Sequence, residues 1–180
     1  MADNLPVSGE YYPSGASLNV CRITTVEGKE YDIKNNVIEL SYFEDLYAFC
    51  ISGYIMLRDG LGLINLLQIS GGEKLELSFD NDNDPNTGVK TFMIYKIGDR
   101  SPTGNMNSEF YKIYFCTKDL VSNEQIKVSK SYKGKKIVDI VDDIVKNYLN
   151  TDRDFTKKQD TFGYYDFIVP TLRPLEAISW

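Results

Sequence analysis

The sequence predicts a mainly β protein with an α+β extension at its C-terminal end. Between residues 18 and 116, most segments alternate apolar and polar side chains with the period of two that a β-strand requires. Glycine, asparagine and proline interrupt this alternation at short intervals, as the turns of an antiparallel sheet do. Apolar residues at helical spacing occur only after residue 135. We therefore expect an N-terminal arm (1–17), an antiparallel β-barrel or sandwich (18–128) and the start of an incomplete α/β domain (129–180).

The alternating segments are expected to be the strands of the barrel. These segments are 18–26, 30–33, 37–43, 52–59, 73–79, 89–97 and 109–116. The segment 37–43 is expected to bury the face formed by Ile38, Leu40 and Tyr42. The apolar run 61–67 is too short for a free-standing helix and is expected to form one helical turn that plugs an end of the barrel.

The later part of the barrel region contains two connections. A polar segment, 99–105, is rich in turn-forming residues and is predicted to be a loop between two strands. Residues 118–125 are expected to end the barrel, and 126–128 to add a short strand.

The C-terminal part has a different pattern. Apolar side chains at helical spacing predict a helix over 135–149. The segment 162–169 is predicted to be a strand that Pro170 ends. Pro174 is expected to open a second helix, because proline suits a first helical position, and Glu176 favours the same helix N-terminus.

The composition excludes several classes of function. The 180-residue chain has a net charge of −6 and no histidine, which removes Ser-His-Asp and Cys-His catalysis and the common histidine-containing metal sites. An acidic chain is poorly suited to grip nucleic-acid phosphates, although it can line a channel through which DNA slides. No apolar run is long enough for a membrane span. Cys21, Cys50 and Cys116 are expected to be buried free thiols in strands, as suits a reducing cytoplasm.

The carboxylates Asp80, Asp82 and Asp84 imitate the first half of a calcium-binding loop. Such a loop needs glycine at its sixth position and glutamate at its twelfth, where this chain has Pro85 and Thr91. The segment is therefore expected to be an exposed hairpin loop. These three aspartates are the candidate metal ligands that the sequence suggests. Because the calcium-loop pattern is incomplete, no metal or cofactor is predicted.

Two other groups of carboxylates are candidates for a catalytic site. Glu44 and Asp45 are adjacent, and neighbours on a strand point to opposite faces, which does not suit a two-carboxylate hydrolase. Asp139, Asp142 and Asp143 are expected to be solvated on the polar face of the 135–149 helix. No enzymatic activity is predicted.

The order of several segments resembles a known family. The stretch 37–79 combines an apolar strand, the Glu44-Asp45 pair, a strand ending in Asp59, a leucine/isoleucine turn and Gly71-Gly72-Glu73 before an alternating strand. Further along, 129–149 precedes Val169-Pro170 and the segment 174–178. Together these segments resemble the baseplate central hub proteins of T-even-type contractile-tailed bacteriophages, whose tail-tube-like fold is related to the base of the type VI secretion spike.

The resemblance implies a structural protein that joins the tail tube to the spike through ring-like oligomerisation. Its partners would be other copies of the chain, the tail tube protein, the spike protein and the baseplate wedge proteins, with DNA passing the lumen without specific binding. It would be assembled in the bacterial cytoplasm and reside in the virion. Family hubs are trimers with two tube-type barrels per subunit. This chain offers one barrel, so a trimer and a hexamer-like ring both stay open, and residues are expected to follow Trp180.

Contacts with neighbouring subunits are expected on edge strands, on the N-terminal arm and on the loops 80–88 and 99–107. The candidate interface residues are Tyr11, Tyr12, Asp84, Asn86, Arg100 and Asn105. An alternative function is that of a β-sandwich module that binds carbohydrate or protein through exposed tyrosine and tryptophan side chains.

Overall fold

The computed structural model describes residues 17–80, 88–102, 108–149, 151 and 159–180. The chain divides into two compact units. Unit 1 contains the chain up to Leu40 and Tyr54–Phe115, and unit 2 contains Ser41–Gly53 and Cys116–Trp180. The predicted mainly β fold is confirmed, since antiparallel strands form most of the regular structure. Within the described residues, no helix combines the length and the apolar character needed to cross a membrane.

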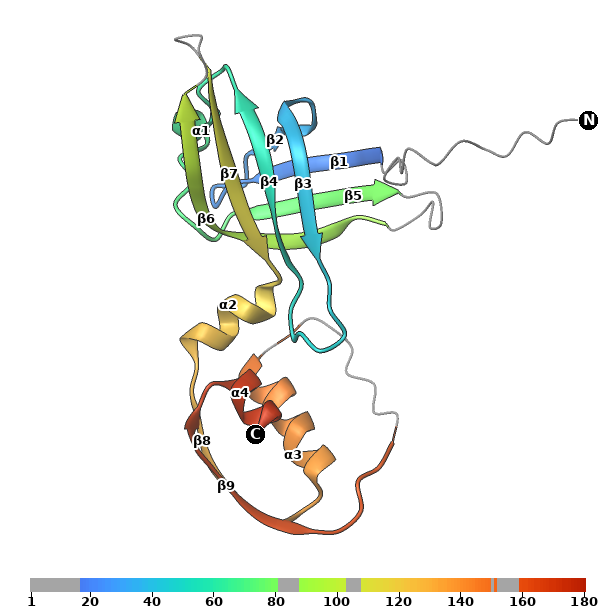
Figure 1. Ribbon diagram of the computed structural model, residues 1–180. Helices are drawn as coiled ribbons and strands as arrows, with labels where there is room; N and C mark the ends of the chain where they lie inside the picture. The colour runs from blue at the N-terminus through green and yellow to red at the C-terminus, as the bar shows by residue number, and fades with distance from the viewer. Residues whose placement is uncertain (1–16, 81–87, 103–107, 150, 152–158) are drawn as a thin grey trace, which may run out of the picture. The chain divides into compact units, whose positions relative to one another are not determined.

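A seven-stranded sheet in the order β2-β1-β5-β6-β7-β4-β3 forms the first part of the fold (Figure 1). Its strands are β1 (Ser17–Thr24), β2 (Glu30–Asp32), β3 (Val37–Phe43), β4 (Ser52–Asp59), β5 (Lys74–Asp80), β6 (Lys90–Pro102) and β7 (Glu109–Cys116). Among the described residues the sheet is open rather than closed into a barrel, with β2 and β3 as its edges.

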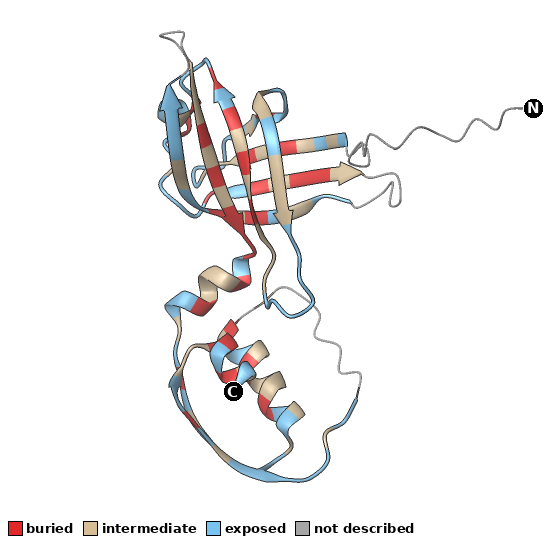
Figure 2. Ribbon diagram, in the orientation of Figure 1, coloured by how far each residue is buried: buried red, intermediate tan, exposed pale blue. Residues whose placement is uncertain are grey.

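Alternation along the strands positions the core of unit 1. In β4, Ile55 and Leu57 are buried while their neighbours are not, and Figure 2 shows the same alternation along β7. The register of β5 places Leu75 opposite both Ile23 of β1 and Phe92 of β6. Each such side chain contributes about 1.5–3 kcal/mol through its burial.

A short helix, α1 (Leu63–Leu67), follows β4 and buries both of its terminal leucines, so the predicted helical turn is present. Its N-terminus is held by the side chain of Asp59, which accepts hydrogen bonds from the backbone N–H groups of Leu61 (2.9 Å) and Ile64 (3.3 Å). The buried hydroxyl of Tyr111 donates to the same carboxylate over 3.2 Å. Burial raises the pKa of Asp59, but the hydrogen bonds together lower it by a larger amount. The net pKa therefore lies below its ordinary value.

Unit 2 packs helices against a two-stranded antiparallel ribbon (Figure 1). Its elements are α2 (Lys118–Gln125), β8 (Val128–Lys135), α3 (Ile137–Ile144), a π-helical turn (Val145–Leu149), β9 (Tyr165–Leu172) and α4 (Pro174–Ser179). The ribbon pairs Lys130 with Val169 and Tyr132 with Phe167. Its inner face and the helices bury a common core of Val128, Tyr132, Ile140, Ile144, Val169 and Ala177.

The two predicted helices of the C-terminal part are confirmed. α3 and the π-helical turn occupy the 135–149 stripe. α4 begins at Pro174, and the Glu176 carboxylate accepts a hydrogen bond from the backbone N–H of Arg173 over 3.1 Å.

Two local predictions were wrong, and one helix had not been predicted. The segment 118–125, expected only to end the barrel, forms α2; its packed side chains, Asp119 and Asn123, are polar, so no apolar stripe indicated a helix. The strand expected at 126–128 runs from Val128 to Lys135. β9 continues through Pro170 to Leu172, which is possible because β9 pairs on one side only and proline is tolerated at a sheet edge.

Three further expectations differ from the structure. The segment Asp99–Pro102 belongs to β6 rather than to a loop, with Asp99 in a left-handed conformation (φ 54°). Ile38 is 53% exposed, because β3 is an edge strand. Cys50 lies half-buried in the connection between β3 and β4, whereas Cys21 and Cys116 lie in strands, where burial raises the pKa of their thiols to about 12 and about 11.

Candidate assembly surfaces

The described part of the chain includes one of the six predicted interface residues. Tyr11, Tyr12, Asp84, Asn86 and Asn105 lie outside the described residues. Arg100 lies on β6 and pairs with Glu109 on β7, with Nη2 at 2.9 Å from Oε1 and Nε at 3.1 Å from Oε2. This two-pronged pair fixes the side chain within its own sheet.

The candidate metal ligands are only partly described. Asp80 accepts a hydrogen bond from the Asn19 side chain over 2.6 Å, while Asp82 and Asp84 lie outside the described residues. No group of three metal-ligating side chains occurs among the residues that the structure describes.

The adjacent carboxylates Glu44 and Asp45 follow β3 instead of lying on a strand. Glu44 accepts a hydrogen bond from the Tyr42 hydroxyl (2.9 Å), and the Oδ1 atom of Asp45 accepts one from the backbone N–H of Tyr47 (2.8 Å). Both carboxylates thus hold the turn that connects β3 to β4.

Asp143 was expected to be solvated, but it anchors α3 to the ribbon. Its Oδ2 atom accepts hydrogen bonds from Lys130 Nζ (2.8 Å) and the Tyr132 hydroxyl (2.7 Å), and Oδ1 accepts one from Asn147 (2.9 Å). Burial raises the pKa of Asp143, but the hydrogen bonds from these donors together lower it by a larger amount, so the net pKa is below its ordinary value. The carboxylate is therefore a structural anchor that stays ionised at neutral pH.

Replacing Asp143 by alanine is expected to lower the free energy of unfolding by about 2 kcal/mol, because the buried Tyr132 hydroxyl and Lys130 lose their acceptor. The matched control is Asp142→Ala, which removes an exposed ion pair with Lys146 and should cost under about 0.5 kcal/mol. Thermal unfolding followed by tryptophan fluorescence measures both. Equal losses in the two variants would contradict the anchoring role.

A cluster of tyrosines and lysines on β4, β6 and β7, which the sequence reasoning missed, covers one face of the large sheet. The Tyr114 ring lies 5.9 Å from the Tyr54 ring and 6.2 Å from the Tyr95 ring. Lys112 Nζ stands 4.4 Å from the centre of the Tyr54 ring, and Lys96 Nζ stands 4.8 Å from that of Tyr114. These contacts order the side chains in advance, which lowers the entropy cost of a protein contact on this face.

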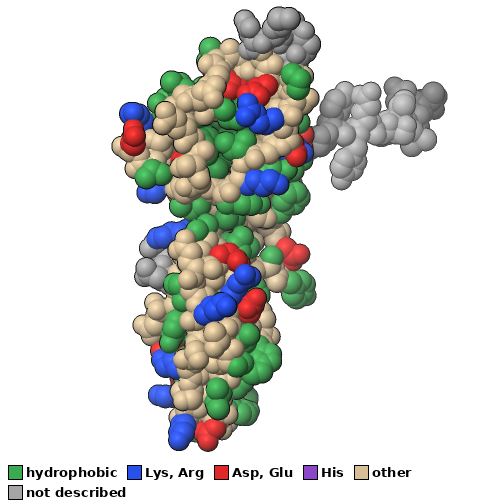
Figure 3. Space-filling view, turned by 90° about the vertical axis from the view of Figure 1, so that its left-hand side faces the viewer, with side chains coloured by type: hydrophobic (Ala, Val, Ile, Leu, Met, Phe, Trp, Pro, Cys, Tyr) green, Lys and Arg blue, Asp and Glu red, His purple; other side chains and the backbone are tan. Residues whose placement is uncertain are grey.

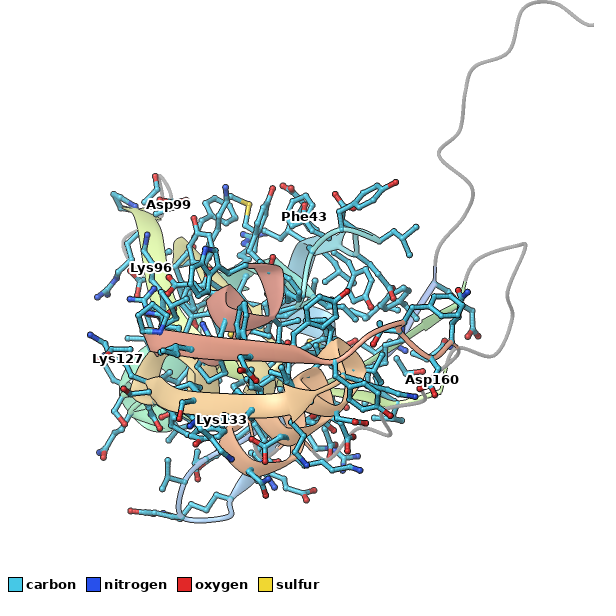
Figure 4. All side chains as sticks on the ribbon, turned by 90° about the horizontal axis from the view of Figure 1, so that it is seen from below. Phe43, Lys96, Asp99, Lys127, Lys133 and Asp160 are labelled. Carbon is cyan, nitrogen blue, oxygen red and sulfur yellow. The ribbon has the colours of Figure 1, made fainter. Side chains whose placement is uncertain are left out.

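The carboxylate of Asp99 contacts two members of this cluster, Tyr114 and Lys112. It accepts a hydrogen bond from the Tyr114 hydroxyl over 2.7 Å and lies 3.5 Å from Lys112 Nζ. The bond to Asp99 is the main reason that the pKa of Tyr114 is raised. Figure 4 shows Asp99 and Lys96 near each other on β6. The signal in the sequence was the presence of tyrosine and lysine close together on both strands, as Tyr95-Lys96 on β6 and as Lys112 and Tyr114 on β7.

The turn between β3 and β4 is a second surface that sequence reasoning missed. All seven residues from Phe43 to Phe49 are exposed, and Leu46 and Tyr47 are 91% and 89% exposed. Exposed hydrophobic side chains also gather in groups on the face shown in Figure 3. Contiguous exposed apolar surface of this kind marks interaction sites.

The sequence matches no protein-family model and no curated protein. Among solved structures, it is similar to a tail protein from Neisseria meningitidis MC58, with 12% identity and a TM-score of 0.57. The match covers 91% of this chain and 44% of that chain. The 43 kDa tail protein of prophage MuSo2 from Shewanella oneidensis matches with 12% identity and a TM-score of 0.56, covering 89% of this chain and 46% of that one.

This chain has a phage tail protein fold. A structure of the Francisella PdpA–VgrG complex also has this tail protein fold in part, with 16% identity, a TM-score of 0.50 and coverage of 88% of this chain and 24% of that chain. The resemblance that the sequence suggested is thus confirmed at the level of the fold. The chain spans less than half the length of these solved structures.

Proposed function

We propose that this chain is a structural component of a contractile phage tail, and specifically part of the central hub that joins the tail tube to the spike. The observation that carries the proposal is the tail protein fold, which covers about nine tenths of the chain in two tail proteins. In this proposal the chain has no enzymatic activity, and it works in the baseplate of the virion with the tail tube, the spike and the wedge proteins as its partners.

The edges of the large sheet support assembly into a ring. β2 and β3 end the sheet on opposite sides, so each presents backbone groups that a strand from another chain can pair with. Pairing the β3 edge of one copy with the β2 edge of the next is head-to-tail, and such contacts close into a ring when the rotation permits. Residues 18–128 then supply the ring, and 129–180 begin the accessory domain.

The state of the described carboxylates supports a structural role. Asp59, Asp143 and Glu73 each accept several hydrogen bonds from their own unit, as structural groups do. The net charge of −6 suits a lumen that lets DNA pass without holding it.

Blocking the β3 edge tests ring assembly. Native mass spectrometry of the purified chain is expected to show a closed trimer or a sixfold ring. Ile38→Lys should weaken assembly about tenfold or more, since lysine on an edge strand opposes further strand pairing. The control is Val89→Lys, which introduces the same charge at an exposed apolar residue away from both edges. This variant should assemble normally. A chain that stays monomeric alone and with isolated tail tubes refutes the proposal.

A further inference from the structure

A patch of uncompensated positive charge lies on the ribbon of unit 2. Residues 127–136 contain five lysines and no aspartate or glutamate, although the whole chain is acidic. Lys130 and Lys136 pair with Asp143 and Asp160 at 2.8 and 2.9 Å. The other three are exposed, and none of them pairs with a carboxylate in the part of the chain that the structure describes. We call these three lysines, Lys127, Lys133 and Lys135, together with Ile168, the lysine face.

The register of the ribbon places Ile168, a member of the lysine face, on its outer side. Ser131 pairs with Ile168. In the flanking pairs, Val169, Tyr132 and Phe167 pack in the core, and Lys130 reaches Asp143 of α3. Because side chains alternate across a strand, Ile168 points outward, and it is 68% exposed. Figure 4 views this side of the ribbon, with Lys133 labelled on β8 and Lys127 labelled just before its first residue. An exposed isoleucine among lysines suits a protein partner, which supplies both apolar and acidic groups, better than a phosphate backbone.

The turn between β3 and β4 has the complementary chemistry. Residues 43–49, which we call the acidic turn, combine Glu44 and Asp45 with four large exposed apolar side chains. The four are Phe43, Leu46, Tyr47 and Phe49. They offer on the order of 400 Å², about half of the roughly 800 Å² that each partner buries in a standard interface. Hydrogen bonds to both carboxylates hold the turn in place, so little entropy is lost when it docks.

Within one chain the two surfaces do not cover each other. Both are exposed, and Figure 4 shows Phe43 well away from Lys127 and Lys133. We propose that the acidic turn of one copy docks on the lysine face of a second copy, with the carboxylates against the lysines and the apolar side chains against Ile168. This contact is head-to-tail. It deepens the proposed ring assembly and rests on it, because it names a second pair of surfaces through which neighbouring copies hold each other.

Mutations that change the charges on the two surfaces test this contact. Sedimentation velocity of the full chain across a wide concentration range is expected to show self-association that weakens with added salt. The lysine-face variant K127E/K133E and the turn variant E44K/D45N should each associate about tenfold more weakly or worse, since like charges then face each other. The Asp45→Asn change keeps the side-chain oxygen that accepts the Tyr47 N–H. A mixture of the two variants should recover association, because the charges again oppose.

The matched control is K34E/K74E, which changes the charge by the same amount on exposed lysines of unit 1. Circular dichroism checks that every variant is folded. If the wild-type chain associates but K127E/K133E behaves as K34E/K74E does, or if the mixture does not recover, this contact is refuted while the proposed ring survives. A wild-type chain that is monomeric at every concentration, both alone and with isolated tail tubes, refutes both. Binding of single-stranded DNA that K127E/K133E abolishes, with self-association intact, refutes the contact in favour of a nucleic-acid surface.

Discussion

Replacing Phe115 by alanine is expected to lower the free energy of unfolding by about 4 kcal/mol. Phe115 is completely buried on β7, between β6 and β4 in the sheet order. The centre of its ring lies 4.9 Å from the centre of the Phe92 ring, and the two rings are tilted relative to each other, an arrangement that aromatic pairs prefer. Truncation removes this pair and leaves a cavity that a sheet cannot easily close, because hydrogen bonds hold the strands apart at fixed spacing.

Urea denaturation followed by circular dichroism measures this loss. Phe115→Leu keeps most of the volume and should cost less than about 1.5 kcal/mol. Phe162→Ala is the matched control, since that phenylalanine is exposed and its removal should leave stability unchanged. The fluorescence of the single tryptophan, Trp180, reports on unit 2 through its contact with Phe167, so different midpoints by the two methods would show that the units unfold separately. Similar losses for Phe115→Ala and Phe162→Ala would contradict the burial of Phe115.

Replacing Asp59 by alanine is expected to cost about 3 kcal/mol. Asp59 is 2% exposed, and its carboxylate serves the N-terminus of α1 and the buried hydroxyl of Tyr111. Alanine leaves these donors without an acceptor inside the protein. Asp59→Asn keeps one acceptor oxygen and should cost about 1 kcal/mol, which separates the loss of hydrogen bonds from the loss of charge.

The same carboxylate contributes stability that depends on pH. The pKa of folded Asp59 lies below its ordinary value of 3.8, so the folded state binds this proton less readily than the unfolded state. The contribution is therefore complete above that value and is lost as the pH falls through the folded pKa. The stability difference between the wild type and Asp59→Asn should shrink as the pH is lowered below 3.8. A difference that stays constant across this range would show that the charge of Asp59 makes no contribution.

Much of the fold followed from patterns that lie close together in the sequence. The alternation in β4 predicted both the strand and its buried face, Ile55 and Leu57. Pro174 and Glu176 predicted the start of α4. The same local reasoning failed for α2, where the buried Asn123 accepts a hydrogen bond from the backbone N–H of Leu175, 52 positions along the chain. A polar side chain with so distant a partner is indistinguishable in the sequence from one that faces water.

The candidate assembly surfaces were less predictable than the fold. Arg100 is predicted to be an interface residue from its place in a polar segment; it pairs with Glu109 across two strands, and its interface role stays a prediction. The exposed turn at Leu46 and Tyr47 gave no signal, since apolar residues in a sequence are expected to be buried.

The sequence by itself determined most strands of the large sheet, the two C-terminal helices and the resemblance to a tail protein fold, because each depends on the period and order of neighbouring residues. Only the tertiary structure decided that the sheet is open, that Ile38 lies on an edge, that Asp59 and Asp143 are anchors, and that Lys127, Lys133 and Lys135 stay exposed. The alternation of apolar and polar residues predicts which side chains share a face of a strand. What covers that face depends on strands and helices that arrive from elsewhere in the chain.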